Sequence, residues 1–132
     1  MATIIPDTYR DLLEKPVIVS LATTLPDGSV TVTPVWRDFD GSHIRINTDA
    51  RRLKYQNMVQ RPTVTVLAVD PENPYRYLEV RGKVTHTSAE GASEHIDKLS
   101  QDYTNVQPYP WHTDDEQRVI CYIEPEKVIA HG

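Results

Sequence analysis

The sequence is poor in the residues that support several common kinds of site. Its 132 residues include a single cysteine, Cys121, so an internal disulfide is excluded and a reducing, cytoplasmic location is expected. Cys121 stands in an apolar run, residues 119–123, and is predicted to be a buried small hydrophobic residue. With only five glycines, the chain holds neither a G-x-G-x-x-G fingerprint nor a P-loop.

Long hydrophobic runs and an excess of positive charge are also missing. No apolar stretch approaches the roughly 18 residues that a membrane helix needs, and the N-terminus lacks the basic start of a signal peptide. The net charge of −5 argues against a nucleic-acid partner, which would need a broad basic face. Length and an ordinary composition predict one domain, residues 1–132.

The hydrophobic patterns predict about six strands and three helices. Strand patterns cover residues 17–24, 29–39, 43–48, 63–69, 76–87, 118–123 and 127–130. Helices are predicted at residues 7–14, at residues 51–60, and after Ser88, which is a plausible N-cap. Pro34 inside the second strand suits a sheet edge or a bulge. Because the strands and helices do not alternate regularly, a small, at least partly closed antiparallel barrel is favoured over a doubly wound parallel sheet.

A cluster of cations stands out against the acidic background. Arg51, Arg52 and Lys54 fall in the first turn of the helix predicted at residues 51–60, and Asn57 continues the face of Lys54. Cations at a helix N-terminus oppose the helix macrodipole, so the arrangement favours a bound anion such as a phosphate. A solvated basic surface, paired with Asp49 or with other acids, explains the same cluster equally well.

No pattern of catalytic or metal-ligating side chains is evident. The histidines are scattered, without the spacing of a metal site, at His43, His86, His95, His112 and His131. No serine or cysteine stands in a recognisable nucleophile motif. The chemistry is therefore expected to belong to a bound organic cofactor, with no catalytic side chain and no metal. Several aromatic residues near strand ends or in loops could flank a flat ring or a subunit interface: Trp36, Tyr75, Tyr77, Tyr109 and Trp111.

A series of short motifs runs through almost the whole chain. It comprises VSLAT (19–23), TPVW (33–36), NT (47–48), RLKYQN (52–57), RPTVTV (61–66), PYRY (74–77), EVRGKV (79–84) and EPEKV (124–128). In order and spacing, these motifs resemble the pyridoxamine 5'-phosphate oxidase-like split-barrel superfamily. Within it, the chain is most similar to the small proteins that bind the deazaflavin coenzyme F420. The resemblance implies a protein that is mainly β with helices (α+β), folded as a six-stranded antiparallel split β-barrel of the FMN-binding type.

The resemblance also implies a set of cofactor-binding residues. The cofactor phosphate would be bound by Arg51, Arg52 and Lys54, assisted by Thr48 and Asn57. The ring system would lie along Pro34, Val35 and Trp36, contacted mostly by backbone groups. The family is homodimeric with two cofactor sites at the interface, so Tyr75, Tyr77 or Trp111 could reach the partner's cofactor.

Three functions are compatible with these features. The first is an F420-dependent oxidoreductase that transfers a hydride between the deazaflavin and a small conjugated molecule. An FMN-dependent reductase or oxidase of the same fold is the second, and a non-catalytic cofactor-binding or carrier protein is the third. The local excess of arginine and lysine favours F420, which has an acidic tail. Vitamin B6 oxidation is not expected, because the chain lacks the C-terminal segment that binds the substrate phosphate in true pyridoxamine-phosphate oxidases.

Overall fold

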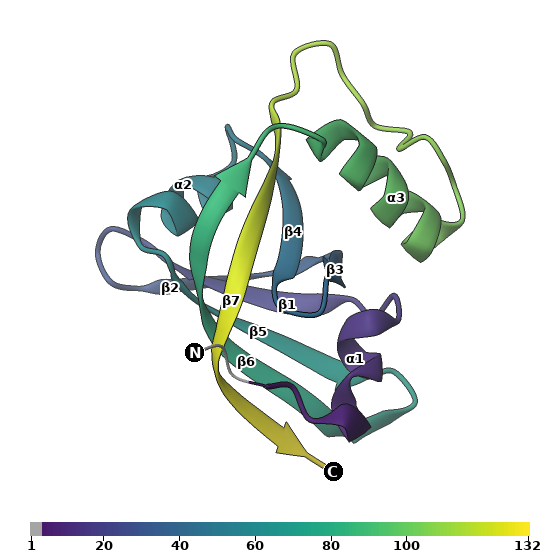
Figure 1. Cartoon of the computed structure of the whole chain (residues 1–132). Coiled ribbons are helices and arrows are strands. Elements are labelled where there is room, and N and C mark those ends of the chain that lie inside the picture. The colour runs from purple at the N-terminus through teal and green to yellow at the C-terminus, as the bar shows by residue number, and fades with distance from the viewer. Residues whose placement is uncertain (1–3) are drawn as a thin grey trace.

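The computed structural model describes residues 4–132 as a curled β-sheet with helices packed around it (Figure 1). The strands are β1 (Val19–Thr24), β2 (Val30–Val35), β3 (Arg37–Phe39), β4 (Ile44–Asp49), β5 (Thr63–Asp70), β6 (Asn73–Ser88) and β7 (Arg118–His131). The helices are the 3-10 turn η1 (Asp7–Tyr9), α1 (Asp11–Glu14), α2 (Leu53–Gln60) and α3 (Ala92–Thr104). Between residues 4 and 132, no helix has the length and apolar character needed to cross a membrane.

The sheet is antiparallel, and its two edges are consecutive in the chain. The strand order is β2-β1-β5-β6-β7-β4-β3, so β2 and β3 are the outermost strands, yet only Trp36 separates them. Neighbouring strands lie about 4.8 Å apart, and one residue cannot span a flat sheet of this width. The sheet therefore curls until its edges approach each other, which is consistent with a split barrel.

The sheet has seven strands and not the six expected of the barrel, and the strand patterns of the sequence differ from it in two places. The strand predicted at residues 29–39 breaks at Trp36, and its halves join opposite edges of the sheet. Conversely, the two strands predicted near the C-terminus are one continuous strand, β7. The register between β6 and β7 shifts by one residue where Gly82 pairs with Pro125, and this irregularity lets β7 run through the proline. Pro34 lies in an edge strand, as expected.

Two helices begin later than predicted. Helix α2 starts at Leu53, with Arg52 as an extended N-cap, so Arg51 lies in the preceding turn. The carboxylate of Asp49 accepts a hydrogen bond from the Arg51 backbone N–H at 2.9 Å and fixes this turn. Helix α3 starts at Ala92, because its N-cap is Gly91 with φ at 75°, a left-handed conformation that favours glycine. Ser88, predicted to be the cap, is the last residue of β6.

The core fills the inside of the curled sheet and is closed by the N-terminal segment and α2. In β1 and β4 every second side chain points inward, as the two-residue period of a strand requires. The core cluster contains Ile5, Leu12, Leu13, Val19, Leu21, Ile44, Ile46, Met58, Val64, Val66, Ala68, Leu78, Val80, Val84, Cys121 and Ile123. Cys121 is fully buried, as expected, and burial raises the pKa of its thiol to about 12.

Gly82 is expected to tolerate no side chain. A Cβ at this position would lie 2.5 Å from the backbone oxygen of Glu124 and 2.9 Å from Cγ2 of Ile123. Gly82→Ala should therefore lower the free energy of unfolding by about 1–3 kcal/mol, the usual cost of overpacking, in a denaturant titration. Lys83→Ala, at the neighbouring exposed position, is the control and should change it by less than about 0.5 kcal/mol. An equally stable Gly82→Ala variant would contradict the tight β6–β7 contact.

Candidate functional site

A cavity of about 330 Å³ opens beside the place where the two edges of the sheet meet. Its wall is formed by the residue before β1, the end of β2, the end of β4, the start of α2, one residue of α3, the loop at residues 105–117 and the start of β7. The lining residues are Ile18, Pro34, Val35, Trp36, Asn47, Thr48, Asp49, Arg52, Lys54, Ile96, Tyr109, Trp111 and Arg118. The structure thus brings together seven of the residues predicted to bind a cofactor: Pro34, Val35, Trp36, Thr48, Arg52, Lys54 and Trp111.

Two cations on this wall have no counter-ion. Neither Arg52 nor Lys54 forms an ion pair or a side-chain hydrogen bond within residues 4–132. Burial, and then the nearby charge of Arg52, lowers the pKa of Lys54 below its ordinary value. A half-buried ammonium beside a second cation is unfavourable in isolation, so the pair is suited to an anion that compensates both charges.

Arg51, Asn57 and Tyr77 lie outside the lining of this cavity. Arg51 donates to both carboxylate oxygens of Asp49, at 2.9 and 2.7 Å, and to Asp115 at 3.0 Å, so its charge is already compensated. These bonds hold the pKa of the Asp49 carboxyl well below its usual range. For Arg51, the structure therefore agrees with the second explanation of the cation cluster, in which the cation is paired with Asp49 and is not free for a phosphate.

Asn57 and Tyr77 are held by other contacts. Asn57 is fully buried, donates to Oγ1 of Thr23 at 3.1 Å, and accepts from Arg61 at 3.0 Å, so it ties α2 to β1. Tyr77 lies in β6 with its ring stacked on His131 of β7, the centroids being 5.1 Å apart.

Aromatic rings form a large share of the apolar wall. The Trp36 ring stacks on Tyr103 with centroids 5.4 Å apart and an angle of 13°, and it meets the edge of Tyr109 at 6.2 Å. Tyr109 in turn contacts Trp111 at 5.5 Å, and Trp111 is 64% exposed. The Tyr103 hydroxyl accepts from the backbone N–H of Arg37 at 3.2 Å and donates to the carbonyl of Val17 at 2.9 Å. Tyr103 therefore fixes Trp36 at the seam of the sheet.

Several lining residues were not predicted from the sequence as cofactor contacts. Asn47 and Asp49 flank Thr48 on β4, and Asp49 pairs in register with Arg118 on β7. Pairing between strands so distant in the chain leaves no local sequence signal for Arg118. Tyr109 was noted only as an aromatic residue in a loop, whereas Ile18 and Ile96 follow ordinary hydrophobic patterns.

The loop at residues 105–117 is clamped to α3 through His112. Its Nε2 lies 2.6 Å from Oδ1 of Asp97 on α3, and its Nδ1 contacts a carboxylate oxygen of Glu116. Because both ring nitrogens face carboxylates, the arrangement favours the imidazolium form. The hydrogen bond with Asp97, and then that with Glu116, raises the pKa of His112 above 6.5. Asp97 also accepts from the backbone N–H of Tyr109 at 2.8 Å, which fixes the aromatic wall.

A second hollow of about 410 Å³ adjoins the first. The two share Asp49, Arg52, Tyr109, Trp111 and Arg118, and the second adds Arg51, Thr113 and Glu116. Within residues 4–132, no group of three or more histidine, cysteine, aspartate or glutamate side chains is placed to hold a metal ion.

Comparisons with known proteins identify relatives of this fold and sequence. A family model described as pyridoxamine 5'-phosphate oxidase matches residues 5–132. A solved structure described as an F420 reductase is 36% identical, with a TM-score of 0.87, and the alignment covers 95% of this chain and 98% of that chain. The resemblance seen in the sequence, to the oxidase-like superfamily and within it to the F420 group, is confirmed by these two matches.

More distant structures show likeness of fold alone. A conserved hypothetical protein from Mycobacterium tuberculosis is 21% identical with a TM-score of 0.76, covering 98% of this chain and 86% of that chain. HupZ of Group A Streptococcus is 18% identical with a TM-score of 0.69, covering 96% and 94%. The comparison with curated protein sequences found no match.

The His112 clamp predicts a specific dependence of stability on pH. Because the pKa of His112 is raised on folding, its stabilising contribution is complete below pH 6.5 and is lost as the pH rises through the folded-state pKa. The difference in free energy of unfolding between the parent protein and His112→Gln should therefore be largest in mildly acidic buffer and shrink as the pH rises. Urea titrations of both proteins across this range measure it. A difference independent of pH would show that the ring is not an imidazolium held by its neighbours.

Proposed function

We propose that this chain, which belongs to the pyridoxamine 5'-phosphate oxidase family, is an oxidoreductase that binds F420 in the cavity beside Trp36. The observation that carries the proposal is the pair of uncompensated cations, Arg52 and Lys54, at one end of an aromatic-walled cavity. A flat heterocycle with a phosphate on a flexible arm has both features that this site complements. The F420 reductase with 36% identity supports the choice of cofactor.

The residues present fit such a cofactor in two parts. Arg52 and Lys54, with the Thr48 hydroxyl beside them, would hold the phosphate. Pro34, Val35 and Trp36 would lie along the ring system. The adjoining hollow of about 410 Å³ offers space for an acidic tail, and the unpaired Arg52 lines both hollows. This space favours F420 over FMN, which has no such tail.

The protein's part in the reaction would be to bind and orient. When bound, a reduced deazaflavin supplies the hydride that a small conjugated molecule accepts. Asp49 is the only carboxylate on the described wall of the cavity, and Arg51 occupies both of its oxygens. We therefore propose that no side chain acts as a catalytic acid, and that shape and charge of the wall select the acceptor molecule. Electrostatic placement of this kind suffices where the cofactor carries the chemistry.

FMN is the second candidate cofactor. It offers a phosphate to Arg52 and Lys54 in the same way, and the family model that matches residues 5–132 is that of the pyridoxamine 5'-phosphate oxidases. An FMN-dependent reductase or oxidase would use the same ring and phosphate positions but leave the second hollow empty of cofactor. A protein that binds the cofactor without turnover is the third candidate, and a screen of acceptor molecules would distinguish it from an enzyme.

We also propose that the protein acts as a homodimer in the cytoplasm. Large exposed hydrophobic residues occur on the β1–β2 edge and on α2: Ile18, Val30, Val32, Leu53 and Val59, each more than half exposed. Exposed apolar surface of this extent favours a protein interface. Ile18 also lines the cavity, and Leu53 stands between Arg52 and Lys54, so this interface would lie next to the cofactor site. Tyr77 and Tyr75 remain proposed contacts to the cofactor of the other subunit.

The proposed function is tested by equilibrium titration of the protein with F420 and with FMN, side by side. Tight binding of F420 together with weak binding of FMN supports the proposal and justifies a screen of conjugated acceptors. The reverse order replaces it with the flavin alternative. Binding of neither cofactor at micromolar concentration rejects both. Tight binding with no oxidation of reduced F420 by any acceptor supports a carrier protein.

Lys54→Ala should weaken binding of whichever cofactor the parent protein prefers. Loss of a hydrogen bond to a charged group corresponds to about 1.5–3 kcal/mol of binding free energy, measured by the same titration. Lys127→Ala removes an exposed lysine of β7 outside both hollows and is the control for general charge effects. If both variants bind as tightly as the parent protein, the phosphate does not bind at Lys54.

Val32→Lys should convert the proposed dimer into a monomer. Val32 is 59% exposed on the edge strand β2, and a lysine there would place a charge inside an apolar interface. Sedimentation equilibrium of parent and variant measures the mass. Thr87→Lys, at an exposed position of β6, is the matched control and should leave the dimer intact. A monomeric parent protein, or a dimeric Val32→Lys variant, would contradict the placement of the interface.

A further inference from the structure

Asn47, on the wall of the cavity, is held in one orientation by its neighbours. Its Nδ2 donates to the backbone carbonyl of Ala92 at 2.8 Å and lies 3.1 Å from Nδ1 of His95. Its Oδ1 accepts from Nη1 of Arg118 at 3.3 Å. A flipped amide would present oxygen to the Ala92 carbonyl and nitrogen to a guanidinium, so both contacts would become repulsive. The side-chain oxygen of Asn47 therefore faces Arg118.

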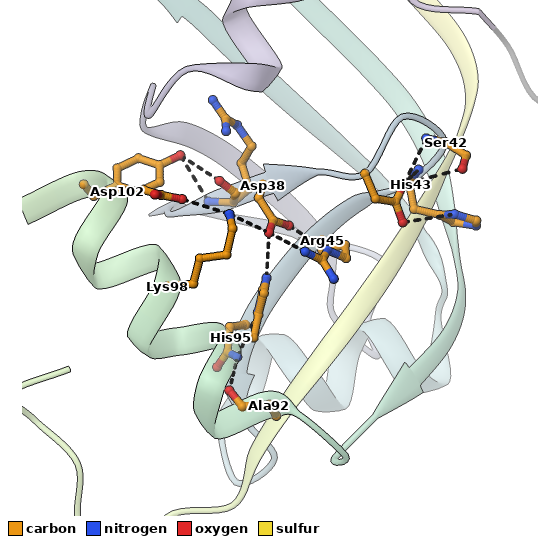
Figure 2. A network of polar contacts seen from close by, with 12 residues as sticks. Asp38, Ser42, His43, Arg45, Ala92, His95, Lys98 and Asp102 are labelled. Carbon is orange, nitrogen blue, oxygen red and sulfur yellow. Dashed lines mark hydrogen bonds and ion pairs between the residues drawn. The ribbon is translucent and has the colours of Figure 1, made fainter. Parts of the chain in front are cut away.

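The orientation of Asn47 in turn fixes the tautomer of His95. Because Asn47 donates to Nδ1, that nitrogen must be the acceptor, and the ring proton resides on Nε2. Nε2 lies 3.2 Å from Oδ2 of Asp38, and the His95 side chain is only 4% exposed. Figure 2 shows His95 reaching from α3 toward Asp38, with Ala92 at the start of the same helix.

Asp38 is kept ionised at the far end of this chain of contacts. Arg45 donates to its two oxygens at 2.8 and 2.6 Å, and Lys98 donates to Oδ2 at 3.2 Å (Figure 2). Burial acts to raise the pKa of Asp38, but the contacts with His95 and Arg45 outweigh it and hold the pKa well below its usual range. The carboxylate lies 3.2 Å from Nε2 of His95 without hydrogen-bond geometry, so it attracts the Nε2–H electrostatically.

The series of contacts that begins at Asp38 reaches the cavity at Arg118. Its Nε donates to Glu116 at 3.2 Å, its Nη1 to Asn47, and its guanidinium lies over the Tyr109 ring at 4.9 Å. Its side chain is only 15% exposed, and within residues 4–132 its Nη2 has no hydrogen-bond partner. Arg118 lines both hollows, so a donor of fixed direction stands where they join.

We propose that Asp38, His95 and Asn47 are positioning residues that hold Arg118 in place, and that Nη2 of Arg118 donates to a carbonyl or carboxylate oxygen of the molecule bound in the cavity. The ligand half of this inference rests on the proposed function, because it takes the cavity as the cofactor site. The positioning half does not. Hydrogen bonds join His95, Asn47 and Arg118, and the Asp38 carboxylate adds an electrostatic contact to His95, so the orientation of the Asn47 amide is fixed from the side of α3.

The positioning half is tested on the protein without any cofactor. A two-bond ¹H–¹⁵N correlation spectrum of the histidine rings should show His95 with its proton on Nε2 and an unprotonated Nδ1. The spectrum of His95→Gln assigns the signals by their loss. A His95 ring protonated on Nδ1 overturns the positioning half.

The ligand half is tested by a double-mutant cycle in cofactor binding, with F420 or FMN, whichever the parent protein binds. Arg118→Ala should weaken binding about 10-fold or more, the range for a lost hydrogen bond to a charged group. Asn47→Leu should weaken it by a smaller factor, about 3- to 10-fold, because Arg118 remains but is no longer oriented. The double variant should bind no more weakly than Arg118→Ala alone. Lys127→Ala, which removes an exposed lysine of β7 outside both hollows, is the control and should change binding less than about 2-fold.

Each result decides between clear alternatives. Effects of Asn47→Leu and Arg118→Ala that simply multiply would show that Asn47 acts on the fold and not through Arg118, and they overturn the proposal. Unchanged binding by Arg118→Ala overturns the ligand contact. A parent protein that binds neither cofactor rejects the proposed function and, with it, the contact between Arg118 and the ligand. The histidine spectrum still confirms or overturns the positioning half in that case.

Discussion

The two outermost strands of the sheet are neighbours in the chain, and the curvature of the molecule follows from that connection. One residue, Trp36, bridges β2 and β3, so the sheet cannot lie flat. Tyr103 of α3 holds the bridge from outside by stacking on Trp36 and by bonding the backbone of Val17 and Arg37. The cavity lies at this seam, and its walls come from segments that only the closed sheet brings together. The site is thus a consequence of how the barrel closes.

The charges around the seam divide into those that hold the structure and those left for a ligand. Arg51 is tied to Asp49 and Asp115, which fixes the turn before α2. Arg118 belongs to both groups, because its Nε and Nη1 bind Glu116 and Asn47 while its Nη2 has no partner within the described residues. Arg52 and Lys54 have no such partners within the described residues. Paired cations give a rigid frame, and unpaired ones raise the local potential where an anion would bind. Both kinds are needed for a preorganised site.

Local patterns in the sequence predicted most of this architecture, and tertiary contacts account for the rest. Alternation of side chains located nearly every strand, and the cluster of cations at residues 51–54 pointed to the part of the chain that contributes Arg52 and Lys54 to the cavity. Trp36 is not a residue type that usually ends a strand, so the sequence predicted a single strand there. The chain instead turns at Trp36, because closure of the sheet brings its two edges together. Arg118 and Asn47 meet only because β4 pairs with β7. Asp49 and Asp115 bind Arg51 whereas Arg52 lines the cavity, a difference that composition could not reveal.

Both tryptophans of the chain, Trp36 and Trp111, line the same cavity, and neither lies elsewhere in the fold. Indole emission from this protein therefore originates entirely from the walls of one site. A conjugated ring system bound in this cavity would lie beside both indoles and would accept their excitation energy. The tryptophan fluorescence of the unlabelled protein therefore reports whether a conjugated ligand occupies the cavity.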